Sequence, residues 1–187
     1  EDYKKLEKIL VSRDDKDYFY QCIKSDPEHV NVFGKFRKKN DPVFAADQRS
    51  KYFKYQGVGL DVFSLEKSNR FAAHMAKFLY QNLIHPTQYI KSRFWRHFAI
   101  KSVQLLNFGL LIPLCRLIGH INHKGQYRYK LGSGFYQCGF SAEDILPLRT
   151  MEFEGIEFPV PGNTDAYLTK IYGDWRKLPS EEQIRKT

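Results

Sequence analysis

Cysteines are scarce in this sequence, and several signals of secreted and membrane proteins are missing from it. Its three cysteines, Cys22, Cys115 and Cys138, are too few and too scattered for a disulfide framework. It contains no Asn-x-Ser/Thr sequon, and its first residues do not form a signal-peptide pattern. The longest uncharged stretch, residues 102–115, is shorter than the roughly 20 residues of a spanning helix. We therefore expect a soluble, cytoplasmic protein of a reducing compartment.

Positive charge and aromatic side chains are abundant instead. Lys plus Arg number 30 against 21 Asp plus Glu, a formal net charge of +9, and 16% of the residues are aromatic. A surplus of this size favours polyanionic partners, which include nucleotides, nucleic acid and the anionic face of a membrane. The charge alone does not choose among these three. A hydrophobic share of 42% is enough for a proper core, and 187 residues fit one domain.

The pattern of apolar residues predicts a mixed α+β fold. Residues 2–11 carry a helical apolar stripe, while residues 18–23 and 32–38 have the composition or alternation of short strands. The segment 57–65 (GVGLDVFSL) is apolar on both faces, as in a strand that is buried on both sides. We therefore expect residues 57–65 to form the central strand of a sheet.

Helices are predicted for most of the region that follows. One apolar stripe is made of Phe71, Met75, Phe78, Leu79 and Leu83. A second continues through residues 90–105. A third helix is expected over about residues 102–121, with Pro113 as the site of a kink or an interruption.

Cations alternate with aromatic residues in the segment 91–98 (KSRFWRHF). We interpret it as an amphipathic core helix with a basic outer face, although such a stretch can also bind a membrane surface or nucleic acid. The apolar stretch 105–119 has two interpretations as well, either core packing or weak peripheral contact with anionic lipid.

The C-terminal region contains clear turn and capping signals. Ser141 followed by Asp144 is a capping-box pattern for a short helix, and residues 153–158 predict a tight hairpin around Gly155. A helix over about residues 165–172 should end at Gly173.

Asp61 is the residue whose context most suggests chemistry, because it is the only acid in an apolar strand. Burying an ionised carboxylate without partners costs several kcal/mol, so Asp61 needs a cation or several donors. Both metal ligation and a structural role, held by backbone N–H groups or an arginine, satisfy this need. Lys35 and Arg37 share one face of the preceding strand, where they either bind phosphate or form a solvated edge.

Two other motifs are weaker. Cys115, Cys138, His120 and His123 are acceptable zinc ligands, but their spacing matches no standard zinc site. Gly132-x-Gly134 followed by Gly139 is not a dinucleotide-binding fingerprint, because the third glycine is misplaced and no strand–helix unit surrounds it.

Three segments together resemble the LicD family, relatives of fukutin and fukutin-related protein within the polymerase-β-like nucleotidyltransferase superfamily. They are residues 33–40 (FGKFRKKN), residues 57–66 (GVGLDVFSLE) and residues 153–182, which carry Phe-Glu-Gly, Tyr-Leu, Tyr-Gly-Asp and Leu-Pro in the family's order. Ser64 and Glu66 stand where the family usually has Pro and Asp. Residues 67–150 are unmatched in detail.

The resemblance implies a nucleotidyltransferase-like mixed sheet flanked by several helices. It describes residues 1–187 as a single domain, made of a core remainder (1–66), a variable helical region (67–150) and a C-terminal part (151–187). In the family, a helix like the one at residues 2–11 follows an Asp-rich catalytic strand and a nucleotide-holding helix. We therefore expect those two elements to precede Glu1, and this chain alone to be inactive.

The implied reaction is metal-dependent transfer of a phospho-alcohol, most often phosphocholine, from a CDP-alcohol to a glycan hydroxyl. The resemblance implies that Asp61 is catalytic and binds Mg²⁺ or Mn²⁺, which would neutralise the pyrophosphate and activate the acceptor. Lys35 and Arg37 are implied to balance the charge of the donor phosphates, and Asn40 is implied to bind substrate. Tyr172 and Asp174 either close over the donor or belong to a helix cap.

The expected acceptor is a cell-surface glycan, which can be lipid-linked, so peripheral contact with an anionic membrane is also expected. No nucleic acid partner is expected under this interpretation. Two alternatives stay open: a nucleotidyltransferase that acts on nucleic acid or a small molecule, and a non-catalytic fragment or binding module.

Overall fold

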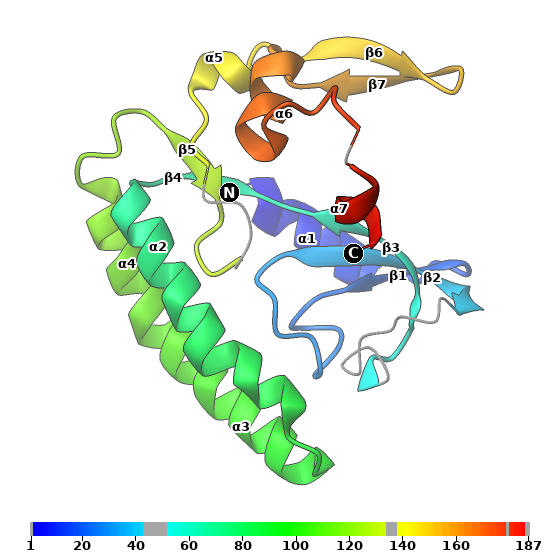
Figure 1. Ribbon diagram of the computed structural model, residues 1–187. Helices are drawn as coiled ribbons and strands as arrows, with labels where there is room; N and C mark the ends of the chain where they lie inside the picture. The colour runs from blue at the N-terminus through cyan, green and yellow to red at the C-terminus, as the bar shows by residue number, and fades with distance from the viewer. Residues whose placement is uncertain (1, 43–51, 134–137, 179, 186–187) are drawn as a thin grey trace. The chain divides into compact units, whose positions relative to one another are not determined.

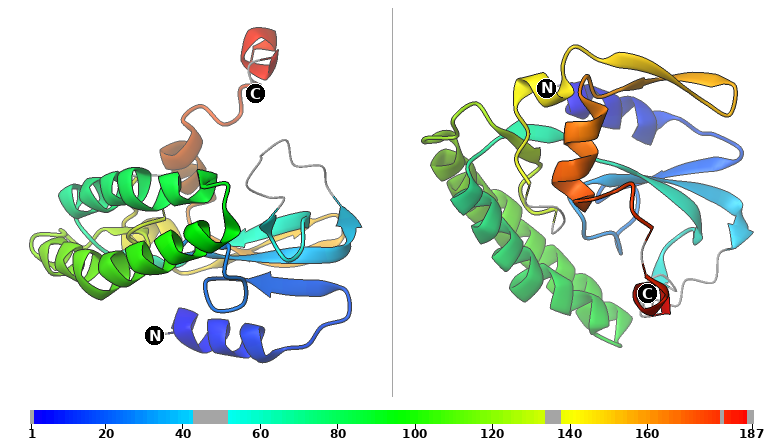
Figure 2. Two further views of the ribbon diagram at one scale, coloured as in Figure 1. Left: turned by 90° about the horizontal axis from the view of Figure 1, so that it is seen from below. Right: turned by 45° about the horizontal axis from the view of Figure 1, so that its top comes forward.

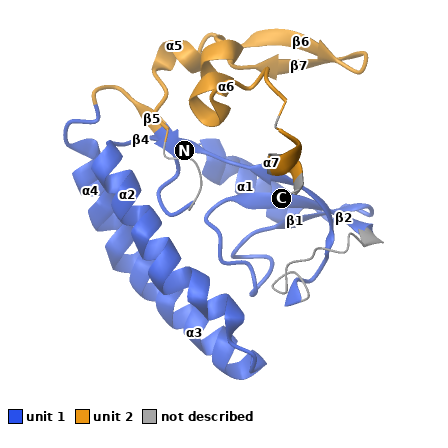
Figure 3. Ribbon diagram, in the orientation of Figure 1, with its two compact units in different colours: residues 1–123, 128–137 blue, residues 124–127, 138–187 orange. Residues whose placement is uncertain are grey.

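The computed structural model describes residues 2–42, 52–133, 138–178 and 180–185 (Figure 1). It has the mixed α+β composition that the sequence predicts, with small antiparallel sheets. Two compact units form, one from residues 1–123 and 128–137 and the other from residues 124–127 and 138–187 (Figure 3). The single domain expected over residues 1–187 stays a prediction. The stretch 43–51 and Gly134 of the glycine motif lie outside the described residues.

An antiparallel three-stranded sheet is the basis of the first unit. Its order is β1 (Tyr18–Gln21), β2 (Gly34–Pro42) and β3 (Gly57–Val62), and helix α1 (Asp2–Ser12) precedes it. Tyr3 of α1 accepts a hydrogen bond from the Gly34 N–H at 3.1 Å, and its hydroxyl lies 3.2 Å from that of Tyr20. A side chain at Gly34 would collide with the Tyr20 ring, so the glycine permits this close approach.

The predicted central strand 57–65 differs from the structure in two respects. It ends at Val62, and a separate strand β4 (Leu65–Lys67) pairs with β5 (Tyr127–Tyr129) instead. Among the described strands β3 is at the edge of its sheet, and Val58 and Leu60 are 59% and 71% exposed. The expectation that this strand is buried on both faces was therefore wrong. A run of apolar residues does not show whether other elements pack on one face of the strand or on both.

Glu66, which stands where the LicD pattern usually has Asp, connects β4 to its neighbours. Its carboxylate accepts hydrogen bonds from the Leu131 N–H at 2.7 Å and from Arg116 Nε at 3.0 Å. The nearby Ser64 carbonyl accepts from the Lys130 N–H at 2.9 Å. These bonds join the end of the sheet segment to a helix and a loop that lie 50 or more residues away in the sequence.

The helical region of the first unit is a long antiparallel hairpin. Helix α2 (Arg70–Leu79) continues through a π turn, η2 (Tyr80–Ile84), and a 3-10 turn, η3 (His85–Tyr89). Helix α3 (Arg93–Leu106), the π turn η4 (Asn107–Leu111) and α4 (Ile112–His120) then form one continuous 28-residue helix beside α2 (Figures 1 and 2). Pro113 sits in the first positions of α4, and the π turn directly before it interrupts the α-helical pattern there, although the helix continues through it.

Small residues, rather than the predicted aromatic stripe, face the core between these helices. Ala72, Ala73 and Ala76 of α2 pack in one cluster with Ile112 and Cys115. Of the predicted stripe, Phe71, Met75 and Phe78 are exposed, whereas Leu79 and Leu83 are partly buried and Leu79 packs against this cluster. A side chain at Gly119 of α4 would meet Ser68 Oγ at 2.7 Å, so the two helices approach closely there.

The segment 91–98 fits only part of its prediction as a core helix with a basic outer face, because Lys91 and Arg93 are exposed but the aromatic residues do not face the core. Phe94, Trp95 and Phe98 are exposed, whereas Arg96 is 1% exposed. Arg96 forms two hydrogen bonds with Glu28, at 2.8 and 2.9 Å, and donates to the Ile90 carbonyl at 2.9 Å. The hydrogen bonds to Glu28 raise the pKa of Arg96. A buried cation is tolerated here because all of its charge is met by one carboxylate and nearby carbonyl groups.

The second unit confirms the C-terminal predictions. Ser141 and Asp144 form the capping box of α5 (Ala142–Ile145), and β6 (Arg149–Phe153) pairs with β7 (Ile156–Val160) around Gly155. Helix α6 (Thr164–Tyr172) ends at Gly173, whose φ is +71°. A last helix, α7, covers Glu181–Arg185. The Phe140 and Tyr167 rings stack with centroids 4.6 Å apart.

Candidate functional site

Strand register brings two of the predicted site residues together. Lys35 of β2 lies opposite Asp61 of β3, and Arg37 lies opposite Gly59. Side chains alternate along a strand, so Lys35, Arg37 and Asp61 lie on one face of the sheet, here named the polar face. Lys35 Nζ contacts Asp61 Oδ1 at 2.8 Å, with 25% and 32% of the two side chains exposed. The acid in the apolar strand thus has a cationic partner that solvent can still reach.

Arg37 is held in place by more hydrogen bonds within the protein than Lys35. Its Nε donates to Gln21 Oε1 at 2.6 Å, and its Nη1 donates to the Gly57 carbonyl at 3.0 Å. Burial lowers the Arg37 pKa, while the negative charges of Asp61 and Asp26 oppose that effect. Arg37 therefore supplies positive charge to the polar face from a fixed position.

Gln21 and Asp26 support Arg37, and neither was singled out from the sequence. Gln21 Nε2 donates to Asp26 Oδ2 at 2.8 Å, which orients the amide so that its oxygen faces Arg37. Asp26 Oδ1 accepts from the Glu28 N–H at 3.0 Å, and Oδ2 also accepts from the Lys54 N–H at 3.1 Å. In the sequence, Asp26-Pro27 looks like a simple turn, so its network was visible only once the chain had folded.

His29 is a second residue that sequence reasoning missed. It is buried, and its Nε2 donates to the Phe33 carbonyl at 2.8 Å, which leaves Nδ1 as an acceptor. Among the described residues, Nδ1 has no hydrogen-bond partner. Burial, helped by the positive charges of Lys35 and Arg37, lowers the pKa of His29 to about 4. The hydrogen bond to the Phe33 carbonyl and the negative charge of Asp26 oppose this shift. His29 is therefore a neutral imidazole close to the cations of the polar face.

The described residues do not by themselves make a magnesium site. They contain no cluster of three or more His, Cys, Asp or Glu side chains that could hold a metal ion. Asp61 offers one carboxylate, and one of its oxygens already contacts Lys35. Asp26, the other acid whose charge acts on Arg37, accepts hydrogen bonds at both oxygens. Since Mg²⁺ is bound through carboxylates, phosphates and water, Asp61 alone is an incomplete donor set.

The remaining predicted site residues lie elsewhere. Asn40 is exposed near the end of β2, within the stretch between Arg37 and Pro42 where the register against β3 shifts. Tyr172 and Asp174 belong to the second unit, where they flank Gly173, and the Gly173 N–H caps α6 by donating to the Thr169 carbonyl at 2.8 Å. The structure thus describes the helix-cap role of this segment, and a contact with the donor stays a prediction.

The proposed zinc ligands remain a weak set. The His120 and His123 rings lie 6.5 Å apart, and Cys115 is buried in the core between α2 and α4. No metal-holding cluster includes them within the described part of the chain.

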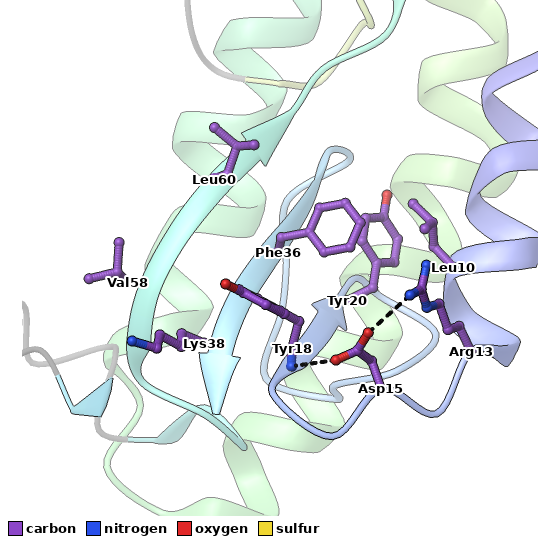
Figure 4. A pocket seen from close by; sticks show the side chains of 9 residues that line it. All are labelled: Leu10, Arg13, Asp15, Tyr18, Tyr20, Phe36, Lys38, Val58 and Leu60. Carbon is purple, nitrogen blue, oxygen red and sulfur yellow. Dashed lines mark hydrogen bonds and ion pairs between the residues drawn. The ribbon is translucent and has the colours of Figure 1, made fainter. Parts of the chain in front are cut away.

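The opposite face of the same sheet is apolar and bears a cavity of about 550 Å³. Figure 4 shows Tyr18, Tyr20, Phe36 and Leu60 around this cavity, with Leu10 entering from α1. Asp15 at its rim accepts a hydrogen bond from the Tyr18 N–H at 3.1 Å and pairs with Arg13 at 3.2 Å. This face offers burial for an apolar group, with Arg13, Asp15 and Lys38 also lining the cavity, whereas the predicted site residues Lys35, Arg37 and Asp61 lie on the polar face.

The chemistry that the polar face can support is phosphate binding. Lys35 and Asp61 lie opposite each other on adjacent strands, and Arg37, whose guanidinium is held in place, lies two residues along β2 from Lys35. Two cations and a solvent-accessible carboxylate in this arrangement suit phosphate recognition. Comparison of this chain with models of protein families, with characterised proteins and with solved structures finds no match.

Proposed function

We propose that this chain is part of a metal-dependent phosphotransferase of the LicD type, which transfers a phospho-alcohol from a CDP-alcohol to a glycan hydroxyl. The observation that carries the proposal is the Lys35–Asp61 contact, with the cation and the carboxylate opposite each other on β2 and β3. The family interpretation names these two positions from the sequence pattern alone, before any pairing of strands is known.

Each residue of the polar face has a proposed part. Lys35 is the mobile cation, because one ion pair, a ring contact with Phe33 at 5.5 Å and a quarter-exposed side chain let it move from Asp61 to a phosphate oxygen. Arg37 provides a fixed positive charge beneath the phosphates, since Gln21 and the Gly57 carbonyl hold it. Once Lys35 turns to the donor, the Asp61 oxygen it leaves becomes available to a divalent cation.

Magnesium, or manganese, would neutralise the pyrophosphate and activate the acceptor hydroxyl when it is bound. Asp61 would hold it together with carboxylates that the described residues do not include. In the LicD family those carboxylates come from an Asp-rich strand, which the described residues do not include. We therefore expect the 187-residue chain to bind a CDP-alcohol weakly and to turn none over.

The direct test is ligand-induced thermal stabilisation of the 187-residue chain by CDP-choline, CDP-ribitol and a nucleoside triphosphate, each with and without Mg²⁺. We expect stabilisation by the CDP-alcohols and its loss in Lys35→Gln. Lys38→Gln is the matched control, because Lys38 lies on the same strand but among the residues lining the apolar cavity. Equal losses in both variants, or stabilisation by the triphosphate alone, would contradict the proposal.

Turnover separates binding from catalysis. A chain extended upstream should hydrolyse the donor in a metal-dependent way, and Asp61→Asn should abolish that activity. Metal-dependent turnover by the 187-residue chain itself would mean that the site is misplaced. An extended chain whose turnover survives Asp61→Asn would remove Asp61 from the mechanism.

A further inference from the structure

The 28-residue helix Arg93–His120 is the long segment α3–α4 in Figure 1. Its exposed side chains form an apolar stripe along its length. Successive members recur about three or four residues apart, which places them on one side of a helix. Their exposed fractions lie between 41% and 77%. The members of this stripe, with the residue that follows the helix, are Phe94, Trp95, Phe98, Leu105, Leu106, Leu110, Leu114, Leu117, Ile118 and Ile121.

The other side of the helix is where it joins the protein. Its buried residues include Arg96, Ile100, Gln104, Ile112 and Cys115, and it packs against α2 (Figure 2). Packing of the first unit therefore does not need the stripe. An exposed apolar surface of this extent is unusual on a soluble protein, and such surfaces mark sites of interaction.

Charge is divided unevenly between this region and the rest of the chain. Residues 67–142 contain eleven Lys and Arg and no Asp or Glu. The other residues hold the remaining 19 of the 30 cations together with all 21 acids, so they are close to neutral. The whole positive surplus thus belongs to the region that carries the stripe.

Three of these cations lie at the stripe itself. Lys91 and Arg93 are exposed just before and at the start of the helix. Lys101 is exposed, three residues after Phe98 and four residues before Leu105. This spacing places it on the same side of the helix as both. The stripe therefore has cations at one end and none between Leu105 and Leu114.

We propose that this stripe docks on the surface of an anionic lipid bilayer, with the helix lying in the plane of the interface. The leucines and phenylalanines enter the acyl boundary, while Lys91, Arg93 and Lys101 contact anionic headgroups. Trp95 suits the headgroup level, where an amphipathic indole ring is favoured. The proposal goes beyond the phosphotransferase function, because that function depends on residues of the paired strands β2 and β3 and not on this helix.

The helix is long and apolar enough to cross a bilayer by length and composition. It lies on the surface instead, because its inner side carries Arg96 bonded to Glu28 and Arg116 bonded to Glu66. Crossing would carry these ion pairs into hydrocarbon or break them, at a cost of several kcal/mol each. Surface docking leaves both pairs in place.

Other occupants fit the stripe less well. Nucleic acid needs cations spaced along its backbone, and the leucine-rich half of the stripe has none. A second copy of this chain would bring two acid-free, cationic surfaces together, which repel each other. An anionic bilayer meets both the apolar and the cationic parts.

The first measurement uses tryptophan fluorescence of the full chain with vesicles. Trp175→Phe leaves Trp95 as the sole tryptophan, since the sequence has two. Vesicles of phosphatidylcholine mixed with phosphatidylglycerol should shift Trp95 emission to the blue, and salt should reverse the shift. Vesicles of phosphatidylcholine alone should shift it much less.

Two triple variants, assayed by vesicle co-sedimentation, separate the apolar from the cationic contribution. Leu105→Asn/Leu110→Asn/Leu117→Asn should weaken partitioning by at least about tenfold, because three inserted side chains become polar. Its matched control is Leu148→Asn/Ile156→Asn/Leu178→Asn, three exposed apolar residues of the second unit. Lys91→Gln/Arg93→Gln/Lys101→Gln should weaken partitioning on the order of a hundredfold. Lys8→Gln/Lys16→Gln/Lys177→Gln removes the same charge from exposed positions elsewhere and should have little effect.

Several results would overturn the proposal. They are no partitioning to anionic vesicles, equal losses in a variant and its control, or concentration-dependent self-association that the leucine variant abolishes without any lipid binding. Tighter binding to RNA than to vesicles would also overturn it. All substituted side chains are exposed, so unchanged unfolding free energies should accompany the losses; if the leucine variant fails to fold, the charge variant decides alone.

Discussion

Two ion pairs in the first unit differ in how completely the protein satisfies them. Arg96 and Glu28 have side chains that are 1% and 8% exposed, and two hydrogen bonds join them. Lys35 and Asp61 are 25% and 32% exposed and share one contact. We call the buried Arg96–Glu28 pair the closed pair and the partly exposed Lys35–Asp61 pair the open pair.

The difference teaches which pair is structural and which can take part in binding. Arg96 also donates to the Ile90 and Lys91 carbonyls, so its donors are used within the protein. His97 Nε2 lies 2.8 Å from Glu28 Oε1, which places a third group around the same carboxylate. Within the described residues, Lys35 contacts only the Asp61 carboxylate and the Phe33 ring, so a ligand phosphate can replace Asp61 at small cost.

The largest expected effect follows from breaking the closed pair. Arg96→Met leaves the Glu28 carboxylate buried without its main partner, which should lower the unfolding free energy by about 3–5 kcal/mol. Chemical denaturation of the variant and the parent chain measures the difference. The double change Arg96→Met/Glu28→Leu should recover most of the loss, because no uncompensated charge then remains. If the unfolding free energy of Arg96→Met lay within about 1 kcal/mol of that of the parent chain, the Arg96–Glu28 pair would not be a buried structural pair.

The second prediction uses the imidazole that lies beside the open pair. His29 has a pKa of about 4 in the folded chain and 6.5 as its ordinary value, so between these values the unfolded chain binds a proton that the folded chain does not. Stability should therefore fall as the pH drops from 6.5 to 4, by about 3 kcal/mol in total, and change little from this residue below pH 4.

Denaturation curves across this pH window test the assignment. In His29→Gln the amide can still donate to the Phe33 carbonyl but does not titrate, so the loss of stability should be much smaller. His74→Gln is the matched control, because His74 is exposed on α2. An unchanged pH dependence in His29→Gln would mean that another group is responsible.

The smallest expected effect on stability concerns the open pair. Asp61→Asn should change the unfolding free energy by less than about 1 kcal/mol, since the pair is partly solvated and joined by one contact. The same variant should lose donor-dependent stabilisation with Mg²⁺. A large loss of stability, comparable with that of Arg96→Met, would place Asp61 among the structural residues and would remove the contrast between the two pairs.

Local patterns predicted the secondary structure of the second unit well. The Ser141–Asp144 capping box, the hairpin at Gly155 and the helix ending at Gly173 all form where the sequence indicates them. Each depends on hydrogen bonds or backbone angles within a few residues, so the necessary information is adjacent in the chain.

The helical hairpin shows where such patterns fail. The periodicity of Phe71, Met75 and Phe78 is real, yet these side chains are exposed and Ala72 and Ala76 face the core. Periodicity shows that a helix has two unlike sides, but it does not say which side meets the protein. Close approach of α2 and α4 favours the small residues at the contact, and the large ones are left outside.

For the candidate site, the sequence by itself determined that Lys35 and Arg37 share a strand face and that Asp61 is a solitary acid in need of a partner. Only the tertiary structure decided that Lys35 is that partner, because the register of β2 against β3 is set by contacts between residues far apart in the chain. The same holds for Gln21, Asp26 and His29, whose roles arise from hydrogen bonds and burial that form when the chain folds back on itself. Residue type and local spacing can be taken directly from the sequence. The burial of side chains and the pairing of distant strands and charges depend on the folded structure.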